Sequence, residues 1–321
     1  MADVKMNNGL SLEEKYHKTD AELFSFVEYK PEEAERTGNS EYSYWGSVWK
    51  NFLKKKMAVI LSFVFIAVFI FSFLSKVIGK YDYNKLVPDS SVMFTSPNSE
   101  YWFGTDNLGR DYWCQVWFAA RTSIELAALV GVGQTLLGVL IGCIWGYIRK
   151  VDWFFTELYN IMDNVPTIIY MTLIALMVGK SFTIMTVSLI FFGWLGVARN
   201  IRNLVMMYRD REYNLASRCL GTKVSTILTR NILPYLISVI ILRMALSIPQ
   251  TIGYETTLSY LGLGLGVDTP SLGILLRNSR AFFLDFPYLL IFPAVIVSLI
   301  TITFYLVGNA FSDAADPRNH V

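Results

Sequence analysis

The class of fold is decided by the run Met57-Ala-Val-Ile-Leu-Ser-Phe-Val-Phe-Ile-Ala-Val-Phe-Ile-Phe-Ser-Phe-Leu74, which contains 18 residues and no charge. As a helix, this run is about 27 Å long, close to the roughly 30 Å apolar core of a bilayer. Lys54, Lys55 and Lys56 lie directly before it. Because the cytoplasmic flanks of spanning helices are rich in Lys and Arg, the pattern predicts a first transmembrane helix that follows a cytoplasmic segment.

The composition agrees with a membrane protein and argues against several other classes. Hydrophobic residues make up 53% of the 321 residues and charged residues 17%, whereas soluble proteins carry about 25% charge. The net charge of +2 is too small to indicate a nucleic-acid partner. Cys114, Cys143 and Cys219 form no CxxC pair, and the two histidines are His17 and His320. We therefore predict no catalytic, cofactor-binding or metal site in this chain.

Five further apolar stretches complete a predicted set of six transmembrane helices. With the N-terminus inside, six spans place the C-terminus inside as well. The proposed inner segments hold nineteen Lys and Arg residues and the proposed outer segments eight, in agreement with the positive-inside rule. We therefore expect an all-α polytopic membrane protein with both termini in the cytoplasm. The predicted spans are residues 57–76, 124–148, 153–178, 182–200, 235–262 and 288–311.

The remaining segments complete the predicted organisation. The stretch 263–287 carries Gly, Pro and aromatic residues, is too apolar for a simple solvated loop, and is a candidate re-entrant segment on the outer side. The other predicted parts are a cytoplasmic N-terminal tail with an amphipathic lead-in (1–56), a transmembrane domain (57–311), an outer loop (77–123), an inner loop (201–234) and a cytoplasmic end (312–321).

Three of the ionisable residues within the predicted spans, Asp163, Arg243 and Glu255, are candidate functional residues. A charge near the centre of a bilayer costs roughly 2.5–3.5 kcal/mol on insertion scales, so such side chains face protein or water. Pairing inside the helix bundle and a place along a translocation path both remain open. The sequence Asp163-Asn-Val-Pro166 also puts a proline inside the third span, which predicts a kink.

Two glycine patterns have opposite meanings for function. Gly138, Gly142 and Gly146 are four residues apart in the second span, which favours close helix packing over a smooth surface that faces a pore. The outer sequence Gly104-Thr-Asp-Asn-Leu-Gly109-Arg-Asp lacks the Lys and Ser/Thr that a phosphate-binding loop carries after its second glycine. We therefore expect no ATP site in this chain.

The inner loop has the most specific pattern in the sequence. Asp210 is a candidate N-cap for a short helix, and Gly221 a candidate C-terminal stop. Ala216 and Ser217 give that helix a face of small residues. A short, basic helix of this kind has no part in crossing the membrane. We therefore expect this helix to dock into another protein rather than to lie on the membrane surface with its arginines near lipid phosphates.

At this loop the chain resembles the permease subunits of ABC importers, in the oligopeptide/dipeptide/nickel class and of the second-permease type. The motif of that class reads Glu-Ala-Ala, three residues, Gly, nine residues and Ile-x-Leu-Pro. Leu215 stands at the place of the Glu, Ser217 at the second Ala and Asn231 at the Ile. The resemblance implies an ATPase-coupling loop, in which the missing Glu removes one salt bridge to the ATPase. Its residues are Glu212, Leu215, Ala216, Ser217, Gly221, Leu233 and Pro234.

Four other segments are similar to the peptide subfamily, in the same order along the chain. They are Phe103-Gly-Thr-Asp-Asn-Leu-Gly-Arg-Asp111 with Ala120-Arg-Thr-Ser123, Asp163-x-x-Pro166, Leu258-Ser-Tyr-Leu-Gly-Leu-Gly264 and Asp313-Ala-Ala-Asp-Pro-Arg318. The first of these supplies an outer family motif. The residues of that motif are Gly104, Thr105, Asp106, Gly109, Arg110 and Asp111.

The resemblance implies a type I ABC-importer transmembrane domain in the bacterial cytoplasmic membrane. Such a chain is a permease subunit, not an enzyme, of an ATP-driven importer of oligopeptides. Its implied partners are a homologous second permease, two cytosolic ATPases that bind ATP and Mg, an extracytoplasmic peptide-binding protein and the peptide itself. Import of nickel or another small solute is the alternative within the family. A secondary transporter is the alternative outside it, although the inverted repeats and paired acidic residues typical of that class are not evident.

Overall fold

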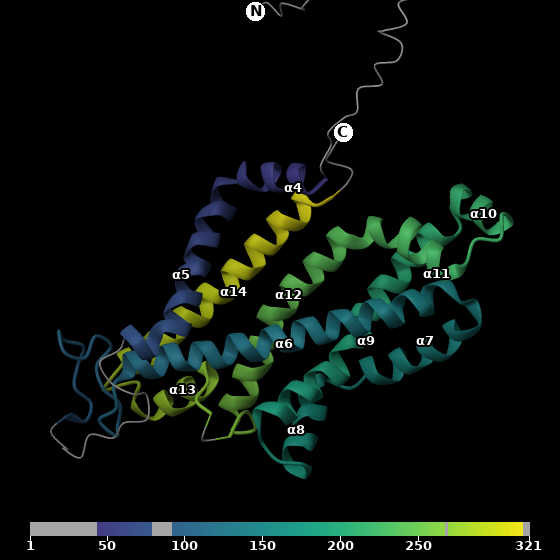
Figure 1. Ribbon diagram of the computed structural model, residues 1–321. Helices are drawn as coiled ribbons and strands as arrows, with labels where there is room; N and C mark the ends of the chain where they lie inside the picture. Colours follow the sequence, from purple (N-terminus) through teal and green to yellow (C-terminus); the bar gives the residue numbers. More distant parts are fainter. Residues whose placement is uncertain (1–43, 79–91, 267–268, 317–321) are drawn as a thin grey trace, which may run out of the picture. The chain divides into compact units, whose positions relative to one another are not determined.

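The computed structural model describes residues 44–78, 92–266 and 269–316, and this part of the chain is nearly all helical (Figure 1). Most of the predicted N-terminal tail, part of the outer loop 77–123 and half of the segment 312–321 lie outside the described residues. The long helices are α5 (Lys56–Ile78), α6 (Tyr112–Tyr147), α9 (Phe182–Arg209), α12 (Leu233–Tyr260) and α14 (Tyr288–Ala314). The shorter ones are α4 (Tyr44–Leu53), α7 (Arg149–Asp163), α8 (Thr167–Met177), α10 (Glu212–Cys219), α11 (Val224–Thr226), η2 (Ile227–Ile232), α13 (Leu272–Ser279) and η3 (Arg280–Phe282).

The described residues contain five helices that are long and apolar enough to cross a membrane, and a bent pair that makes a sixth candidate. The bent pair is α7 and α8, whose axes differ by 78°. The kink expected at Pro166 in the span predicted over 153–178 is a break between two helices in the structure. Only Ile148, in an extended conformation, separates α6 from α7, so the chain reverses there almost without a loop.

The break between α7 and α8 follows from Pro166, which has no N–H to continue the helix. A carbonyl one turn before the proline therefore loses its usual N–H partner. The Tyr170 hydroxyl replaces it by donating to the Met162 carbonyl (3.0 Å). The Tyr170 ring stacks on Phe192 of α9 at 4.6 Å between centroids. An aromatic side chain anchored on α9 thus satisfies backbone that the proline has freed.

Two helices extend beyond the spans predicted from the apolar pattern. Helix α6 begins at Tyr112 rather than at residue 124, and the Asp111 carboxylate caps it by accepting from the backbone N–H of Trp113 (3.0 Å). Helix α9 continues to Arg209 rather than ending at residue 200. Both extensions carry arginines and lie beyond the uncharged apolar runs, yet they remain helical because a cap or neighbouring side chains satisfy their ends.

Close approach between α6 and α9 organises the centre of this part of the fold. A Cβ atom added to Gly138 would lie 2.5 Å from the Val197 Cβ, and one added to Gly142 would lie 2.6 Å from the Ala198 carbonyl oxygen. These separations leave no room for a side chain. The structure thus confirms that the glycines serve helix packing.

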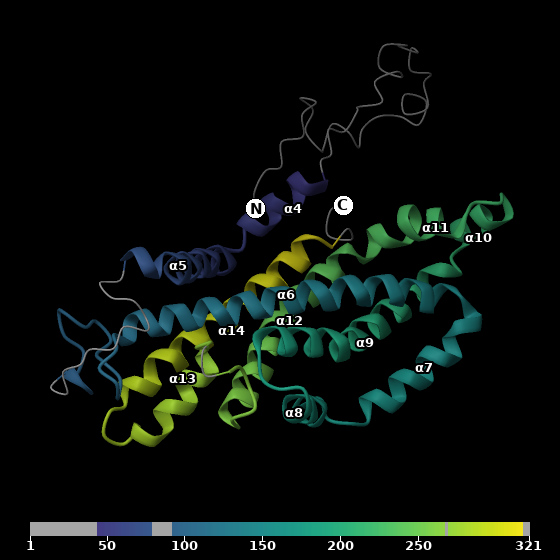
Figure 2. The ribbon, with the colours of Figure 1, turned by 60° about the horizontal axis from the view of Figure 1, so that its bottom comes forward.

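The remaining helices pack around this pair, with α12 against both α6 and α14, and α5 against α14. Figures 1 and 2 both place α10 and α11 at the end of α6 where the chain turns into α7. They place α13 near the opposite end of α6, beside the loop that precedes it (Figures 1 and 2). The two features that sequence motifs mark, the 103–111 turn and α10, are therefore at opposite ends of the spanning helices.

A leucine at Gly142 should destabilise the protein by forcing α6 away from α9. Overpacking of a tight contact costs about 1–3 kcal/mol, which corresponds to an unfolding temperature lower by about 2–10 °C. Thermal unfolding of the purified protein in detergent measures the difference. Gly196→Leu is the matched control on α9, because nothing lies within 4 Å of a Cβ added there. Equal unfolding temperatures for the two variants would contradict the packing role.

Candidate functional site

The connection between α9 and α12, residues 210–232, contains the short helix predicted in the inner loop. This helix is α10, and its C-cap is Leu220. Gly221 follows with φ of +76°, and the N–H groups of Gly221 and Thr222 donate to the carbonyls of Arg218 and Ser217, both at 3.0 Å. Because a Cβ at Gly221 would meet nothing within 4 Å, the left-handed backbone rather than crowding calls for glycine here.

Asp210 does not cap α10 as predicted, because Arg211 occupies the N-cap position and makes no side-chain hydrogen bond there. The Asp210 carboxylate instead accepts from the guanidinium groups of Arg209 (3.0 Å) and Arg218 (3.2 Å), and lies 3.8 Å from that of Arg149. The hydrogen bond from Arg209 is the main cause that lowers the pKa of Asp210 below its usual value. Asp210 thus joins the end of α9, the start of α7 and α10.

Arg209 explains why this carboxylate matters locally. Its side chain is buried, and its guanidinium also donates to the Gly146 carbonyl at the end of α6 (2.9 Å). A buried guanidinium needs a compensating charge or acceptors. Asp210 supplies the charge from the solvent side, where its own side chain is 44% exposed.

The two faces of α10 differ in chemistry. Asn214 is fully buried on the inner face. On the outer face Leu215 is 44% exposed and Leu220, just after the helix, is 85% exposed. Glu212 and Ala216 are also exposed, and Ser217 is half-buried between the faces. The last two motif residues, Leu233 and Pro234, begin α12, where proline lacks only an N–H that a helix start leaves free.

The three candidate functional residues of the predicted spans do not form one site. Glu255 is fully buried on α12 and accepts from the hydroxyls of Ser259 (2.8 Å), Ser271 and Ser123 (3.3 Å). Arg243 donates to the Asn200 side chain (2.7 Å). It precedes Glu255 on the same helix by twelve residues, or about 18 Å.

Glu255 therefore has a place inside the bundle. Its serine partners come from α6, from α12 itself and from the N-cap of α13, so the carboxylate joins three elements. The N-terminal end of a helix favours a negative charge, and α13 begins directly after Ser271, which bonds to Glu255. Asp163, by contrast, is exposed at the last position of α7, beside the break before α8.

The outer family motif folds into a tight turn centred on Asp106. Its carboxylate accepts from the backbone N–H groups of Leu108 and Arg110 (both 2.9 Å) and from the Arg110 guanidinium (2.6 Å). Gly104 and Gly109 both adopt positive φ, of +77° and +71°. The motif thus builds a turn that leads directly into the Asp111 cap of α6.

This turn is also tied to α14. The Tyr288 hydroxyl donates to the carbonyl of Thr105 (2.8 Å), and the Thr105 hydroxyl bonds to the Val92 carbonyl. The Arg110 guanidinium is occupied by Asp106. These contacts give the motif residues a structural part in joining the outer loop to the helices.

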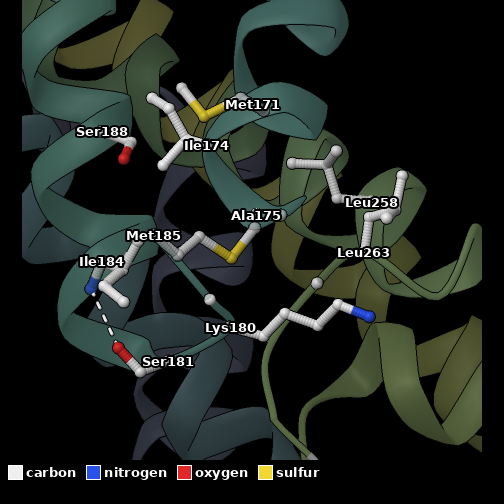
Figure 3. Close-up of a pocket in the computed structure, with 12 residues that line it drawn as sticks. Met171, Ile174, Ala175, Lys180, Ser181, Ile184, Met185, Ser188, Leu258 and Leu263 are labelled. Atoms are coloured by element: carbon white, nitrogen blue, oxygen red, sulfur yellow. Dashed lines mark hydrogen bonds between the residues drawn. The ribbon is translucent and has the colours of Figure 1, made fainter. Parts of the chain in front are cut away.

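Two recesses in the described part of the chain are small. One lies between α8, α9 and the end of α12 and is lined mainly by Met171, Ile174, Met185, Leu258 and Leu263 (Figure 3). Lys180 at its edge donates to the Gly262 carbonyl (2.6 Å). The other lies between the 106–115 segment, α13 and α14. Each has a volume of about 20 Å³, enough for about one water molecule, so neither could hold a peptide.

Residues 137–321 match the family model of the inner membrane component of binding-protein-dependent transport systems. The chain belongs to this family. A second family model, the N-terminal transmembrane domain of oligopeptide transport permease C, matches residues 43–97. Together with the five or six apolar helices among the described residues, membership of this family makes the chain a multi-pass inner membrane protein.

Individual members of this transport family resemble the chain over nearly its whole length. The oligopeptide transport system permease protein AmiD of Streptococcus pneumoniae is 38% identical over 94% of this chain and 98% of its own. Two Bacillus subtilis proteins are each 30% identical. They are the oligopeptide permease protein OppC, over 89% of this chain and 93% of its own, and the dipeptide permease protein DppC, over 95% of each. These relatives are transport permeases rather than enzymes.

A solved structure supports the fold. A chain of the MetNI methionine ABC transporter in an inward-facing conformation superposes with a TM-score of 0.50 at 16% identity. The match covers 61% of this chain and 96% of that one. The predicted type I ABC-importer transmembrane fold is confirmed.

Replacing Asp210 by Asn should loosen α10, because the buried Arg209 loses its compensating charge. The carboxylate is partly exposed, so we expect the amides of α10 to exchange with deuterium only about two- to fivefold faster. Mass spectrometry of peptides from residues 212–222 measures this. Asp313→Asn, which removes the separate ion pair with Lys55, is the control and should leave α10 unchanged.

The same contact gives a direction for the effect of pH. Because the folded-state pKa of Asp210 is lowered, its contribution is complete above the unfolded-state value and is lost as the pH falls through the folded-state value. After correction for intrinsic exchange, wild-type α10 should therefore behave alike at pH 6 and pH 8, and approach the Asn variant only in acid. A difference between wild type and variant that vanished at neutral pH would contradict this role.

Proposed function

We propose that this chain is the permease subunit of an ATP-driven importer of oligopeptides. The observation that carries the proposal is the full-length similarity to AmiD, which is named as an oligopeptide permease. OppC and DppC, named for oligopeptide and dipeptide transport, extend the similarity to other members. The solute is accordingly a peptide.

The proposed partners supply a path wide enough for a peptide and the sites that bind ATP. The two recesses described above have space for about one water molecule each, so a peptide needs a wider path between this chain and a homologous second permease. ATP and Mg bind to two cytosolic ATPase subunits, and an extracytoplasmic protein delivers the peptide to the outer loops. The chain itself does no bond chemistry and contributes half of the path.

We propose that α10 is the seat of one ATPase subunit. Exposed apolar side chains in a polar connection mark a contact surface, and the outer face of α10 presents Leu215 and Leu220. Leu215 stands where the family motif has Glu, so an apolar contact replaces a salt bridge at this point. The coupling residues are those of the motif, namely Glu212, Leu215, Ala216, Ser217, Gly221, Leu233 and Pro234.

Closure of the ATPases on ATP would move α10 and shift the path between inward-facing and outward-facing states, which is alternating access by rigid-body motion. In this scheme Glu255 holds the bundle together through its three serines. Asp163, exposed at the break between α7 and α8, and Arg243 are the candidates to line the path. The 103–111 turn and α13 form the outer side that receives the binding protein.

This scheme needs both termini and α10 to lie in the cytoplasm, as the distribution of Lys and Arg indicates. Single cysteines test it in a chain whose three native cysteines are replaced by serine. We expect Asn107→Cys to react with an impermeant maleimide added to intact cells, and Ser225→Cys to react only after permeabilisation. Both positions are exposed in the structure, and the reverse labelling pattern would refute the orientation.

Peptide uptake tests the function. In a strain without other peptide importers, deletion of this chain should abolish uptake of a labelled oligopeptide and leave uptake of free amino acids intact. Leu220→Asp should still insert in the membrane but lose ATPase copurification and most peptide uptake, because it places a charge in the proposed apolar contact.

The matched control is Leu284→Asp, since Leu284 is 92% exposed at the opposite, proposed outer, side. It should keep ATPase copurification. Peptide uptake that persists in the deletion strain, or a loss of nickel uptake instead, would refute the oligopeptide function. ATPase copurification retained by Leu220→Asp would refute the docking face alone.

A further inference from the structure

Two of the places where this chain departs from the family motif meet in the structure. Asn231 stands where the motif has Ile, and Ser217 where it has the second Ala. The Asn231 amide N–H donates to the Ser217 hydroxyl oxygen (3.4 Å) and to the Asn214 side-chain carbonyl (3.0 Å). Two departures that look unrelated in the sequence thus belong to one hydrogen-bonded group.

The third member of the group, Asn214, is fully buried. Its own amide N–H donates to the Tyr208 carbonyl near the end of α9 (2.9 Å). The Ser217 hydroxyl donates in turn to the Tyr213 carbonyl within α10 (2.8 Å). Each of the three side chains therefore makes a specific hydrogen bond as donor or acceptor. If one were removed, the buried Asn214 amide would be left with an unsatisfied polar group.

Asn231 connects this group to a spanning helix. It lies in η2, a six-residue π-helical segment that continues directly into α12. Ile227 and Ile232 of η2 are fully buried against residues of α9 and α12. Segments of π-helix are rare and occur frequently at functional sites. The foot of α12 is thereby fixed in the bundle and linked by Asn231 to α10.

The side-chain hydrogen bonds that leave α10 run in two directions. Those of Arg218 and the one from the Asn214 amide lead to the end of α9, where they reach Asp210 and the carbonyls of Arg209 and Tyr208. Those made with Asn231 lead to η2 and so to α12. Between α10 and α11 the backbone passes through Gly221, the residue type that constrains a chain least. A displacement of α10 would reach α12 poorly through that backbone.

We propose that Asn214, Ser217 and Asn231 form a latch that makes α10 and the foot of α12 move as one body. The inference rests on the proposed function, and it assigns these three residues a positioning role. When an ATPase subunit displaces α10, the latch delivers the displacement to α12, the helix that carries Arg243 and Glu255. A family member with Ile at this place needs apolar packing for the same link.

The test uses the complete transporter, with both permeases, the ATPases and the binding protein, reconstituted in proteoliposomes. The quantity is the number of labelled oligopeptides imported per ATP hydrolysed. Asn231→Ile restores the motif residue but leaves the Asn214 carbonyl without its donor, and should lower this ratio about fivefold. ATPase copurification should be unchanged, because the outer face of α10 is intact. Thr229→Ala is the control in the same π-helical segment, since the Thr229 hydroxyl donates to the backbone carbonyls of Ser225 and Thr226 in α11 and not to α10.

A second variant keeps the proposal testable if Asn231→Ile assembles poorly. Ser217→Cys combined with Asn231→Cys, in a chain whose native cysteines are serines, removes the latch and allows it to be replaced covalently. The ratio should be low before treatment with a short bifunctional thiol reagent and return towards the wild-type value afterwards. A role in stability alone would change the amount of assembled complex without changing this ratio.

An unchanged ratio in Asn231→Ile would overturn the latch, and so would a crosslinked double variant whose ratio stays low. Failure of the proposed function shows separately, as absent ATP-dependent peptide uptake by the unaltered complex. That result would remove the basis of the latch as well.

Discussion

Backbone polar groups inside a bilayer find no water, and each one left without a partner costs several kcal/mol. Helices satisfy this constraint along their length, but their ends and breaks leave backbone groups without partners. Polar side chains supply those partners at two places in the described structure. Where Pro166 breaks the third span, Tyr170 supplies a hydroxyl to a freed carbonyl. Where α13 starts, Ser271 caps it and meets the buried Glu255. At these two places a polar side chain stands where a regular helix begins or ends.

The two ends of the described helices use their polar groups differently. At one end, the Asp106 turn fixes the start of α6 and leaves few charged groups free for other work. At the other end, Asp210 and Asn214 hold α10 from within, so that its apolar face is presented outward. In the proposed coupling role, a partner that binds the exposed outer face could displace α10 without unfolding it, because the inner face is held by hydrogen bonds.

Much of this arrangement can be read from the sequence, but not all. Long apolar runs predict the spans, and Gly221 with Ala216 predicts the short helix, because these signals are local. The helical segments 112–123 and 201–209 are missed because they carry arginines and lie beyond the uncharged apolar runs. The bond between Ser123 and Glu255 is missed because the two residues lie 132 positions apart in the chain. The bond between Asn214 and Asn231 is missed for a similar reason, since it depends on a π-helical turn that no residue pattern marks.

The contact between α6 and α9 has a consequence for how this family diverges. Gly138, Gly142 and Gly146 each leave their volume to the α9 residue opposite, and the nearest atoms belong to Val197, Ala198 and Arg202. A mutation that adds a methyl group on α6 is then tolerated only with a loss of volume, or a shift of backbone, on α9. Substitutions on the contact faces of α6 and α9 should therefore be correlated, although more than 30 residues of chain separate the two helices.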